Sequence, residues 1–304
     1  KVCGGNIMSG KDFRSGFVSI VGRPNVGKST LMNRILNEKV AIVSNKPQTT
    51  RNRIVGIKHL KDAQIVFLDT PGIHKPKFAM NRRMVKIAME TLEDGDLILF
   101  MVEATAPPGR GDRFILEEIK ETEKPVFLLI NKVDLVKKET ILPLIDEYSR
   151  LMDFKEIVPV SALKGDNAEH LVETMVKYLP VGESFYPDDM VTDQTLRFMA
   201  AEIIREKIFK KTREEIPYSV AVLIEEFLEK NEKGLTRIKA VIIVEKDSQK
   251  GIIIGKSGEM LKAIGTEARQ DLEDLIESKV FLELWVKVKK DWRQDENILT
   301  EMGL

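Results

Sequence analysis

The 304-residue sequence has almost no cysteine and no surplus of charge of either sign. Its single cysteine, Cys3, excludes an internal disulfide framework and a cysteine-ligated zinc site, and it fits a reducing compartment. The 48 Lys and Arg residues equal the 48 Asp and Glu residues in number. No global electric field therefore marks a nucleic-acid coat, a membrane binder or an enzyme for acidic substrates.

Long hydrophobic runs are absent as well. The longest, such as residues 97–102 and 126–130, have the length of a strand, whereas a membrane-spanning helix needs about 18 apolar residues. No charged-then-apolar secretory leader opens the sequence. These features predict a cytoplasmic protein without a transmembrane segment. The sequence starts at Lys1 rather than Met, and we set residues 1–15 aside as an N-terminal lead-in.

From residue 16 to residue 180, short apolar runs alternate with amphipathic stretches. Continuous apolar runs of four to six residues suit strands that are buried on both faces, as in a parallel sheet covered by helices. The alternation predicts a doubly wound α/β domain with a mixed, mostly parallel sheet. We expect strands at 17–21, 65–68, 97–102, 126–130 and 157–160, and helices at 29–37, 78–94, 112–122, 140–152 and 168–178.

A second, smaller α+β domain is expected after a linker. Residues 181–192 contain Gly182 and Pro187 and break any periodic pattern, so we place the linker there. The β-propensity of residues 251–254 favours a strand there. Residues 294–304 are expected to form a C-terminal tail after the second domain. Within the second domain, residues 193–293, we expect helices at 193–214 and 259–278 and strands at 218–227, 237–244 and 280–288.

A phosphate-binding loop occupies residues 22–29, which read G-R-P-N-V-G-K-S. The loop follows an expected strand and precedes an expected helix, so its backbone N–H groups and the helix N-terminus can surround phosphate oxygens. Lys28 would reach the terminal phosphates, and the Ser29 hydroxyl would coordinate Mg²⁺. Asn25 is a candidate ligand for a monovalent cation such as K⁺, and the alternative is that it only shapes the turn.

A guanine-binding element follows the strand at 126–130, in the sequence N-K-V-D at 131–134. The carboxylate of Asp134 can accept two hydrogen bonds from guanine, a donor pair that adenine lacks, which favours GTP over ATP. Asn131 would brace the loop, and the stem of Lys132 would cover the base. Backbone donors of residues 161–163 would contact the guanine oxygen.

Two further segments are expected to respond to the third phosphate. In D-T-P-G at 69–72, Asp69 would hold Mg²⁺ through water and the Gly72 N–H would contact the γ-phosphate. In Q-T-T-R at 48–51, a threonine hydroxyl, assigned to Thr50, would close on Mg²⁺ only when GTP is bound. Lys28, Thr50 and Gly72 are the predicted catalytic residues. The predicted nucleotide contacts are Gly22, Arg23, Pro24, Asn25, Val26, Gly27, Lys28, Ser29, Thr30, Asp69, Thr70, Pro71, Gly72, Asn131, Lys132, Asp134, Ser161, Ala162 and Leu163, with Ser29, Thr50 and Asp69 on Mg²⁺.

Hydrolysis is expected to be slow. Ile73 stands where Ras-like enzymes carry the glutamine that orients the attacking water. No arginine finger can be assigned, although Arg51 and Arg53 lie in a segment expected to move. His74 is an alternative base, against the competing interpretation of a solvated loop histidine. Catalysis would rest mainly on Mg²⁺ and Lys28.

The second domain contains a G-x-x-G element at 255–258, ahead of an amphipathic helix. Paired glycines at this spacing clamp an RNA backbone in KH domains. From residue 185 to the end there are 20 basic and 24 acidic residues, a net charge of −4, so any RNA surface must be local. The predicted RNA contacts are Lys250, Gly255, Lys256, Ser257, Gly258 and Lys262.

With both sets of motifs, residues 16–292 resemble the bacterial Era GTPases. The most specific elements are R-E-E-I-P-Y-S at 213–219, D-S-Q-K-G-I-I-I-G-K-S-G at 247–258 and L-E-L-W-V-K-V-K-K-D-W at 282–292. The resemblance implies a Ras-like GTPase domain and a type II KH domain that binds 16S ribosomal RNA near its 3′ end. It also implies a role in 30S subunit assembly and 16S rRNA maturation, with peripheral association at the inner membrane face. It favours a short helix at 251–254 over the propensity reading, and it makes a hydrophobic Ile73 an expected feature.

Three functions remain open at this point. The first is a switch in which GTP alters how the KH domain docks on RNA. The second is a GTPase that acts in RNA modification with a partner enzyme, a class expected to carry a redox or one-carbon site, for which the sequence has no signature. The third is a nonenzymatic membrane-associated scaffold, which hydrolysis abolished by Lys28→Ala would exclude.

Overall fold

The computed structural model describes residues 13–44, 46–73, 76, 78–229 and 234–304. Contacts between Cα atoms divide these residues into two compact units. The first unit takes the described residues among 1–41, 53–74 and 88–193, and the second takes those among 42–52, 75–87 and 194–304. Two segments expected in the first domain, 42–52 and 75–87, thus group with the second unit. The domain bounds drawn from the sequence stay a prediction.

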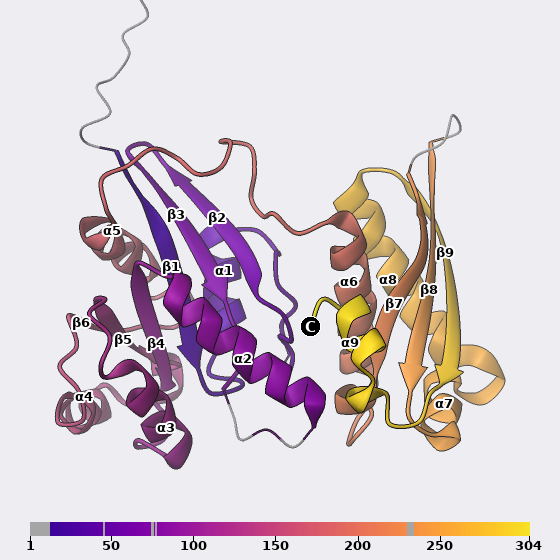
Figure 1. The fold of residues 1–304 in the computed structure, drawn as a ribbon, viewed down its shortest axis with the longest axis horizontal. Coiled ribbons are helices and arrows are strands. Elements are labelled where there is room, and N and C mark those ends of the chain that lie inside the picture. The colour runs from indigo at the N-terminus through magenta and orange to yellow at the C-terminus, as the bar shows by residue number, and fades with distance from the viewer. Residues whose placement is uncertain (1–12, 45, 74–75, 77, 230–233) are drawn as a thin grey trace, which may run out of the picture. The chain divides into compact units, whose positions relative to one another are not determined.

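The first unit is built on one six-stranded sheet in the order β2-β3-β1-β4-β5-β6 (Figure 1). β2 runs antiparallel to β3, and the other neighbouring strands are parallel, which is the mixed, mostly parallel sheet expected. The strand β2 was not among the strands expected. The strands are β1 (Arg14–Gly22), β2 (Ile54–Leu60), β3 (Ala63–Asp69), β4 (Leu97–Glu103), β5 (Val126–Asn131) and β6 (Glu156–Pro159).

Both faces of this sheet are buried, and β4 shows how. Leu97, Leu99 and Met101 lie in the hydrophobic core on one face, and Ile98 and Phe100 lie in the core on the other. Side chains alternate between faces along a strand, so a continuous apolar run requires cover on both sides. Helices α1 and α5 cover the first face, and α2, α3 and α4 cover the second. The helices are α1 (Lys28–Leu36), α2 (Ala79–Asp94), α3 (Arg110–Ile119), α4 (Ile141–Ser149) and α5 (Ala168–Tyr178).

The expected linker is packed on the first unit rather than detached from it. The Ile57 N–H donates to the carbonyl of Val191 at 2.8 Å, and the Thr192 hydroxyl donates to the carbonyl of Val55 at 2.6 Å. The rings of Phe17 and Phe185 lie 4.8 Å apart. The proline and glycine content of 181–192 therefore marks an irregular segment, and its backbone and side chains still bond to the edge of the sheet.

The second unit holds a three-stranded sheet in the order β7-β8-β9, in which β7 and β8 are antiparallel and β8 and β9 are parallel. The parallel connection runs through two helices whose apolar side chains, with those of α6, form the core on one face of the sheet. The elements are α6 (Leu196–Lys211), β7 (Ala221–Leu228), β8 (Leu235–Val244), α7 (Asp247–Ile254), α8 (Glu259–Ile276), β9 (Lys279–Val288) and α9 (Glu296–Glu301).

Residues 251–254 end the helix α7, so the strand favoured by propensity is wrong and the helix favoured by the resemblance is right. The Gln249 side chain accepts from the backbone N–H of Lys246 at 3.1 Å and donates to the Ser219 hydroxyl at 2.9 Å. Ile253 is fully buried in the core. Capping and burial of one helical face outweigh the β-propensity of three consecutive isoleucines.

Five short 3-10 helices complete the described elements, and two of them lie in predicted sites. They are η1 (Val133–Leu135), η2 (Lys138–Thr140), η3 (Pro217–Ser219), η4 (Lys256–Gly258) and η5 (Trp292–Gln294).

Candidate functional site

The phosphate loop connects β1 to α1, as the motif requires. Gly27 is the residue before the helix and has a φ of +108°. A Cβ atom at Gly27 would lie 2.2 Å from Nδ2 of Asn131, so both the backbone conformation and the space exclude a side chain. The loop therefore turns into the helix N-terminus, where backbone N–H groups are available to an anion.

Lys28 is the first residue of α1 and is only 6% exposed. Its Nζ donates to the carbonyls of Gly22 at 3.2 Å and Arg23 at 3.1 Å. Burial lowers the pKa of Lys28 to about 8, and the nearby carboxylate of Asp69 opposes this shift. The ammonium is held by carbonyl groups of the loop that it is predicted to serve, in a place where a phosphate would compete for it.

The next residue, Ser29, donates its hydroxyl to Oδ2 of Asp69 at 2.5 Å. Asp69 ends β3 and is fully buried. A hydroxyl and a carboxylate oxygen are ligands that Mg²⁺ prefers, so this pair fits the ion. Thr50, the third ligand predicted, is 7% exposed and belongs to the second unit, and its place on the ion stays a prediction.

Asn131 connects the phosphate loop to the loops that are predicted to bind the base. Its Nδ2 donates to the carbonyl of Val26 at 2.6 Å, and its Oδ1 accepts from the N–H of Ala162 at 2.9 Å. Asn131 is 2% exposed, and it ends the strand β5, which lies between β4 and β6. One buried amide therefore fixes the spacing between residues predicted to contact phosphate and residues predicted to contact guanine.

The predicted guanine-recognition residue, Asp134, is oriented by Ser161, the residue before Ala162. The Ser161 hydroxyl donates to Oδ1 of Asp134 at 2.6 Å. The backbone N–H of Lys164 donates to that hydroxyl at 3.1 Å, which turns the hydroxyl proton toward the carboxylate. Leu163, whose backbone is a predicted donor to guanine, is in contrast 64% exposed.

Lys132 has a partner that the sequence did not indicate. Its Nζ donates to Oε1 of Glu103 at 2.5 Å, and its backbone has a φ of +66°. Glu103 ends β4 and lies opposite Asn131 in the parallel register of β4 and β5. The sequence signal that could have indicated this contact is the position of Glu103 at the end of an apolar strand that precedes the strand before Lys132.

The residues after β3 are held by the phosphate loop and by the core. The Thr70 hydroxyl donates to the carbonyl of Ile20 at 2.8 Å. A Cβ atom at Gly72 would lie 2.6 Å from Cα of Pro24. The Ile73 N–H donates to the carbonyl of Gly22 at 3.3 Å, and its side chain, 2% exposed, packs in the core. Ile73 is thus a core residue, and His74 lies outside the described residues.

The segment at 42–52 is bonded within the second unit. Arg51 is 2% exposed and donates to the carbonyls of Val220 at 2.7 Å and Pro217 at 3.2 Å. Burial, with the neighbouring Arg205 adding to it, holds the pKa of Arg51 well below its ordinary value. Arg205 also donates to the carbonyl of Thr49. Arg53, in the first unit, pairs with Asp94 at 2.7 Å.

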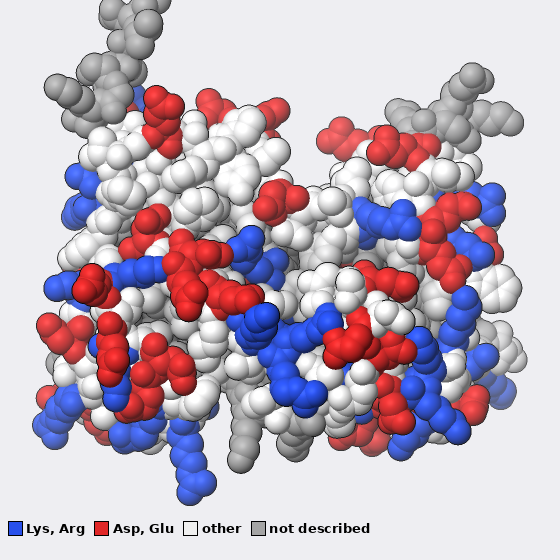
Figure 2. Space-filling view, viewed as in Figure 1, with Lys and Arg blue, Asp and Glu red and all other residues white. Residues whose placement is uncertain are grey.

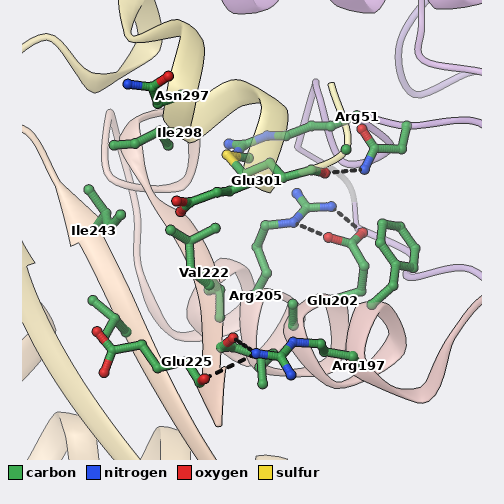
Figure 3. A pocket seen from close by; sticks show the side chains of 18 of the residues that line it. Arg51, Arg197, Glu202, Arg205, Val222, Glu225, Ile243, Asn297, Ile298 and Glu301 are labelled. Carbon is green, nitrogen blue, oxygen red and sulfur yellow. Dashed lines mark hydrogen bonds and ion pairs between the residues drawn. The ribbon is translucent and has the colours of Figure 1, made fainter. Parts of the chain in front are cut away.

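A pocket of about 770 Å³ lies in the second unit, beside Arg51 (Figure 3). Arg205 and Glu202 face each other in it through two hydrogen bonds, and Arg197 donates to the carbonyl of Ile224. Apolar side chains of β7 and β8, Val222 and Ile243 among them, form another wall. None of the predicted nucleotide or RNA contacts lines this pocket.

The G-x-x-G element forms the turn between α7 and α8. Gly255 and Gly258 have φ angles of +74° and +83°. A Cβ atom at Gly255 would lie 2.7 Å from Cβ of Met260, whereas no heavy atom lies within 4 Å of one at Gly258. Lys256 and Ser257 are exposed, so the turn presents backbone and one ammonium to solvent.

Of the other predicted RNA contacts, Lys262 on α8 is exposed and Lys250 on α7 is half-buried. On the face of the second unit visible in Figure 2, Lys and Arg are interspersed with Asp and Glu. A basic surface in this unit is therefore local, in agreement with its net charge.

Comparisons with known proteins match both parts of the chain. The family model described as "50S ribosome-binding GTPase" matches residues 17–132, and the KH domain model matches residues 215–293. These matches confirm the fold expected for each half.

Two curated relatives are similar over nearly their whole length. GTPase Era of Geobacter metallireducens is 55% identical over 97% of this chain and 99% of its own. GTPase Era of Staphylococcus haemolyticus is 51% identical over 96% of this chain and 97% of its own.

Two crystal structures are similar at 48% identity, each covering 96% of this chain and 99% of its own. One is Era in complex with MgGDPNP and nucleotides 1506–1542 of 16S ribosomal RNA, with a TM-score of 0.93. The other is Aquifex aeolicus Era Y63A bound to GDP and AlF4⁻, with a TM-score of 0.92. By sequence, domain content and structure, the chain belongs to the Era family of GTPases.

Proposed function

We propose that this GTPase is a switch that binds 16S rRNA near its 3′ end and assists 30S assembly and 16S rRNA maturation. The observation that carries the nucleotide half is the Asn131 bridge, because it ties the carbonyl of Val26 to the N–H of Ala162. A chance glycine-rich turn has no need of a buried amide that connects it to two further loops.

Selection of guanine is assigned to Asp134. Its carboxylate is fixed by Ser161, and a fixed carboxylate can accept both the N1–H and the exocyclic amine of guanine. An adenine base lacks this pair of donors, so it forfeits the two hydrogen bonds that guanine would make with Asp134.

The proposed ion is Mg²⁺, held by Ser29, Asp69 and Thr50. The short contact between Ser29 and Asp69 supports it, and the similar Era structure contains MgGDPNP. When bound, the ion would supply positive charge to the phosphates. The ammonium of Lys28 would contact the terminal phosphates as well. Asn25, with a φ of +66° in the loop, is the proposed ligand of K⁺, which equal turnover in K⁺ and Na⁺ buffers would contradict.

Hydrolysis in this protein is proposed to be slow without a partner. The side chain of Ile73 is in the core and has no group that can orient water. Backbone donors of the loop, Lys28 and the N–H of Gly72 then carry the stabilisation of charge on the transferred phosphoryl group.

RNA binding is assigned to the exposed turn at 255–258 and the lysines beside it. The KH match and the 16S rRNA segment in the similar Era structure support this assignment. Peripheral contact with the inner membrane face is part of the proposal, and the family resemblance is its support. Within the described residues, no helix has the length and apolar character that crossing a bilayer requires.

Two measurements test the proposal. Calorimetric titration should show GTP and GDP binding at least about a hundredfold tighter than ATP, because an adenine leaves Asp134 without its donors. Equal binding of ATP would contradict the assignment of the site.

Crosslinking to cellular RNA in the presence of a GTP analogue should recover the 3′ end of 16S rRNA. The variant Gly255→Asp, which puts a carboxylate into the turn, should lose that crosslink while retaining GTP binding. Loss of the crosslink in the exposed control Lys279→Ala as well would count against the assigned surface.

A further inference from the structure

Arg23, the second residue of the phosphate loop, forms an ion pair with Asp112, which is distant in the sequence. Nε of Arg23 donates to Oδ1 of Asp112 at 2.8 Å. The Asp112 side chain is fully buried, whereas that of Arg23 is 31% exposed. The arginine stem crosses Gly111 closely, since a Cβ atom there would lie 2.7 Å from Cδ of Arg23. The ion pair is therefore shielded on the carboxylate side, where Coulomb attraction is least screened.

Asp112 is itself fixed from two other directions. Its second oxygen, Oδ2, accepts from the backbone N–H of Gly109 at 2.9 Å, which ties the carboxylate to the start of α3. The fully buried Tyr148 of α4 stands beside it. Burial, and after it the charge of Asp112, raises the pKa of Tyr148 well above its ordinary range. The carboxylate that receives Arg23 thus has little freedom to move.

Arg23 also touches the predicted catalytic lysine. The backbone carbonyl of Arg23 accepts from Nζ of Lys28 at 3.1 Å. The following residue, Pro24, has no N–H of its own, and its fixed φ makes the start of the loop stiff. Holding the Arg23 side chain therefore sets the direction of a carbonyl that Lys28 contacts and the entry of the loop.

We propose that Asp112 is a positioning residue for the binding of GTP and GDP, which acts through Arg23 to hold the phosphate loop in place. The proposal rests on the function proposed for that loop. It adds α3 to the nucleotide-binding site, because a carboxylate in the first turn of this helix also restrains the loop. Asp112 is not among the predicted nucleotide or ion contacts, and its effect is predicted to fall on binding rather than on the chemical step.

A purely structural role is the competing explanation, since Asp112 also stabilises the first turn of α3. A double-mutant cycle separates the two. Asp112→Asn keeps an oxygen for the Gly109 N–H and removes the charge that Arg23 needs. Arg23→Met keeps the apolar stem and removes the donor. Asp146→Asn breaks the exposed pair of Asp146 with Arg150 and serves as the matched control.

Each single variant should raise the KM for GTP and the Kd for GDP about tenfold, as expected for loss of a charged hydrogen bond. The double variant should have a KM and a Kd no higher than those of the single variant that binds more weakly. In all three variants kcat should change less than about twofold, and the control should match the wild type.

Unchanged KM in Arg23→Met would overturn the proposal, whether or not Asp112→Asn folds. A lowered melting temperature with unchanged KM in Asp112→Asn would do the same, and so would effects that add in the double variant. Failure of the wild-type protein to bind guanine nucleotide would contradict the proposed function instead.

Discussion

The amide of Asn131 lies between two loops, 2.6 Å from the carbonyl of Val26 on one side and 2.9 Å from the N–H of Ala162 on the other. Val26 and Ala162 are 136 positions apart in the sequence, and the carboxyl ends of β1, β5 and β6 bring them together. In open α/β sheets this is the edge at which ligands bind.

Replacing Asn131 with Ala should weaken GTP and GDP binding by more than about tenfold and lower the free energy of unfolding by about 1–3 kcal/mol. Both buried partners would lose a hydrogen bond in an enclosed site. Calorimetric titration and urea unfolding measure the two effects. The exposed Asn297→Ala serves as control, and wild-type affinity in Asn131→Ala would contradict the bridging role.

Nucleotide affinity should fall with rising pH above about 8. Burial lowers the pKa of Lys28 to about 8 in the free protein, so the amine is mostly neutral at higher pH. Phosphates favour the ammonium, so binding above pH 8 must take up a proton, and Kd should rise by up to about tenfold per pH unit.

Titrations at pH 7 and 9.5 in two buffers of different ionisation enthalpy detect both the change in Kd and the proton uptake. A Kd that stays level across this range, with no proton uptake, would show that Lys28 remains charged in the free protein. Lys28→Ala should bind weakly and without this pH dependence.

Glu103→Gln should raise the KM for GTP about two- to threefold. The variant removes the charge that fixes the Lys132 side chain, but the pair is partly exposed, and such pairs contribute little to stability, under about 1 kcal/mol. Steady-state kinetics and thermal unfolding measure the effects. A fall in kcat with KM unchanged would place Glu103 in the chemical step and contradict a role in base binding.

Lys256→Ala should weaken binding to the 3′ end of 16S rRNA about three- to tenfold without a change in GTP hydrolysis. The lysine is exposed in the turn, so the variant removes a phosphate contact without disturbing the core. Fluorescence anisotropy measures the binding constant over a range of salt concentrations. The slope of its logarithm against the logarithm of the salt concentration should be smaller in magnitude by about 0.7 in the variant. The exposed Lys279→Ala should bind RNA like the wild type, and an equal loss in both variants would indicate a non-specific charge effect.

The sequence predicted the nucleotide elements because each motif directly follows an apolar run. Runs such as 126–130 are buried on both faces, and topology alone then places the residues after them at one edge. The edge strand β2 escaped prediction because its apolar start at 54–57 gives way to Lys58 and His59. An edge strand has a neighbouring strand on one side only, so the run of apolar residues along it is shorter.

The features that the sequence missed depend on contacts between distant residues. Glu103 meets Lys132, and Arg23 meets Asp112, through side chains whose spacing carries no periodic signal. The segment 42–52 groups with the second unit, where Arg51 donates hydrogen bonds to the carbonyls of Val220 and Pro217. The helix at 251–254 required knowledge of its cap and of its buried face.

The burial of Ile73 has an evolutionary consequence. Introducing glutamine at this position, the residue that Ras-like enzymes use, would place a polar amide inside the apolar layer beneath α2 and α3 at a cost of about 1–3 kcal/mol. A single substitution to glutamine at this position is therefore not expected to give this chain faster GTP hydrolysis. The hydrolysis rate can be raised instead by a partner molecule that supplies a water-orienting group from outside.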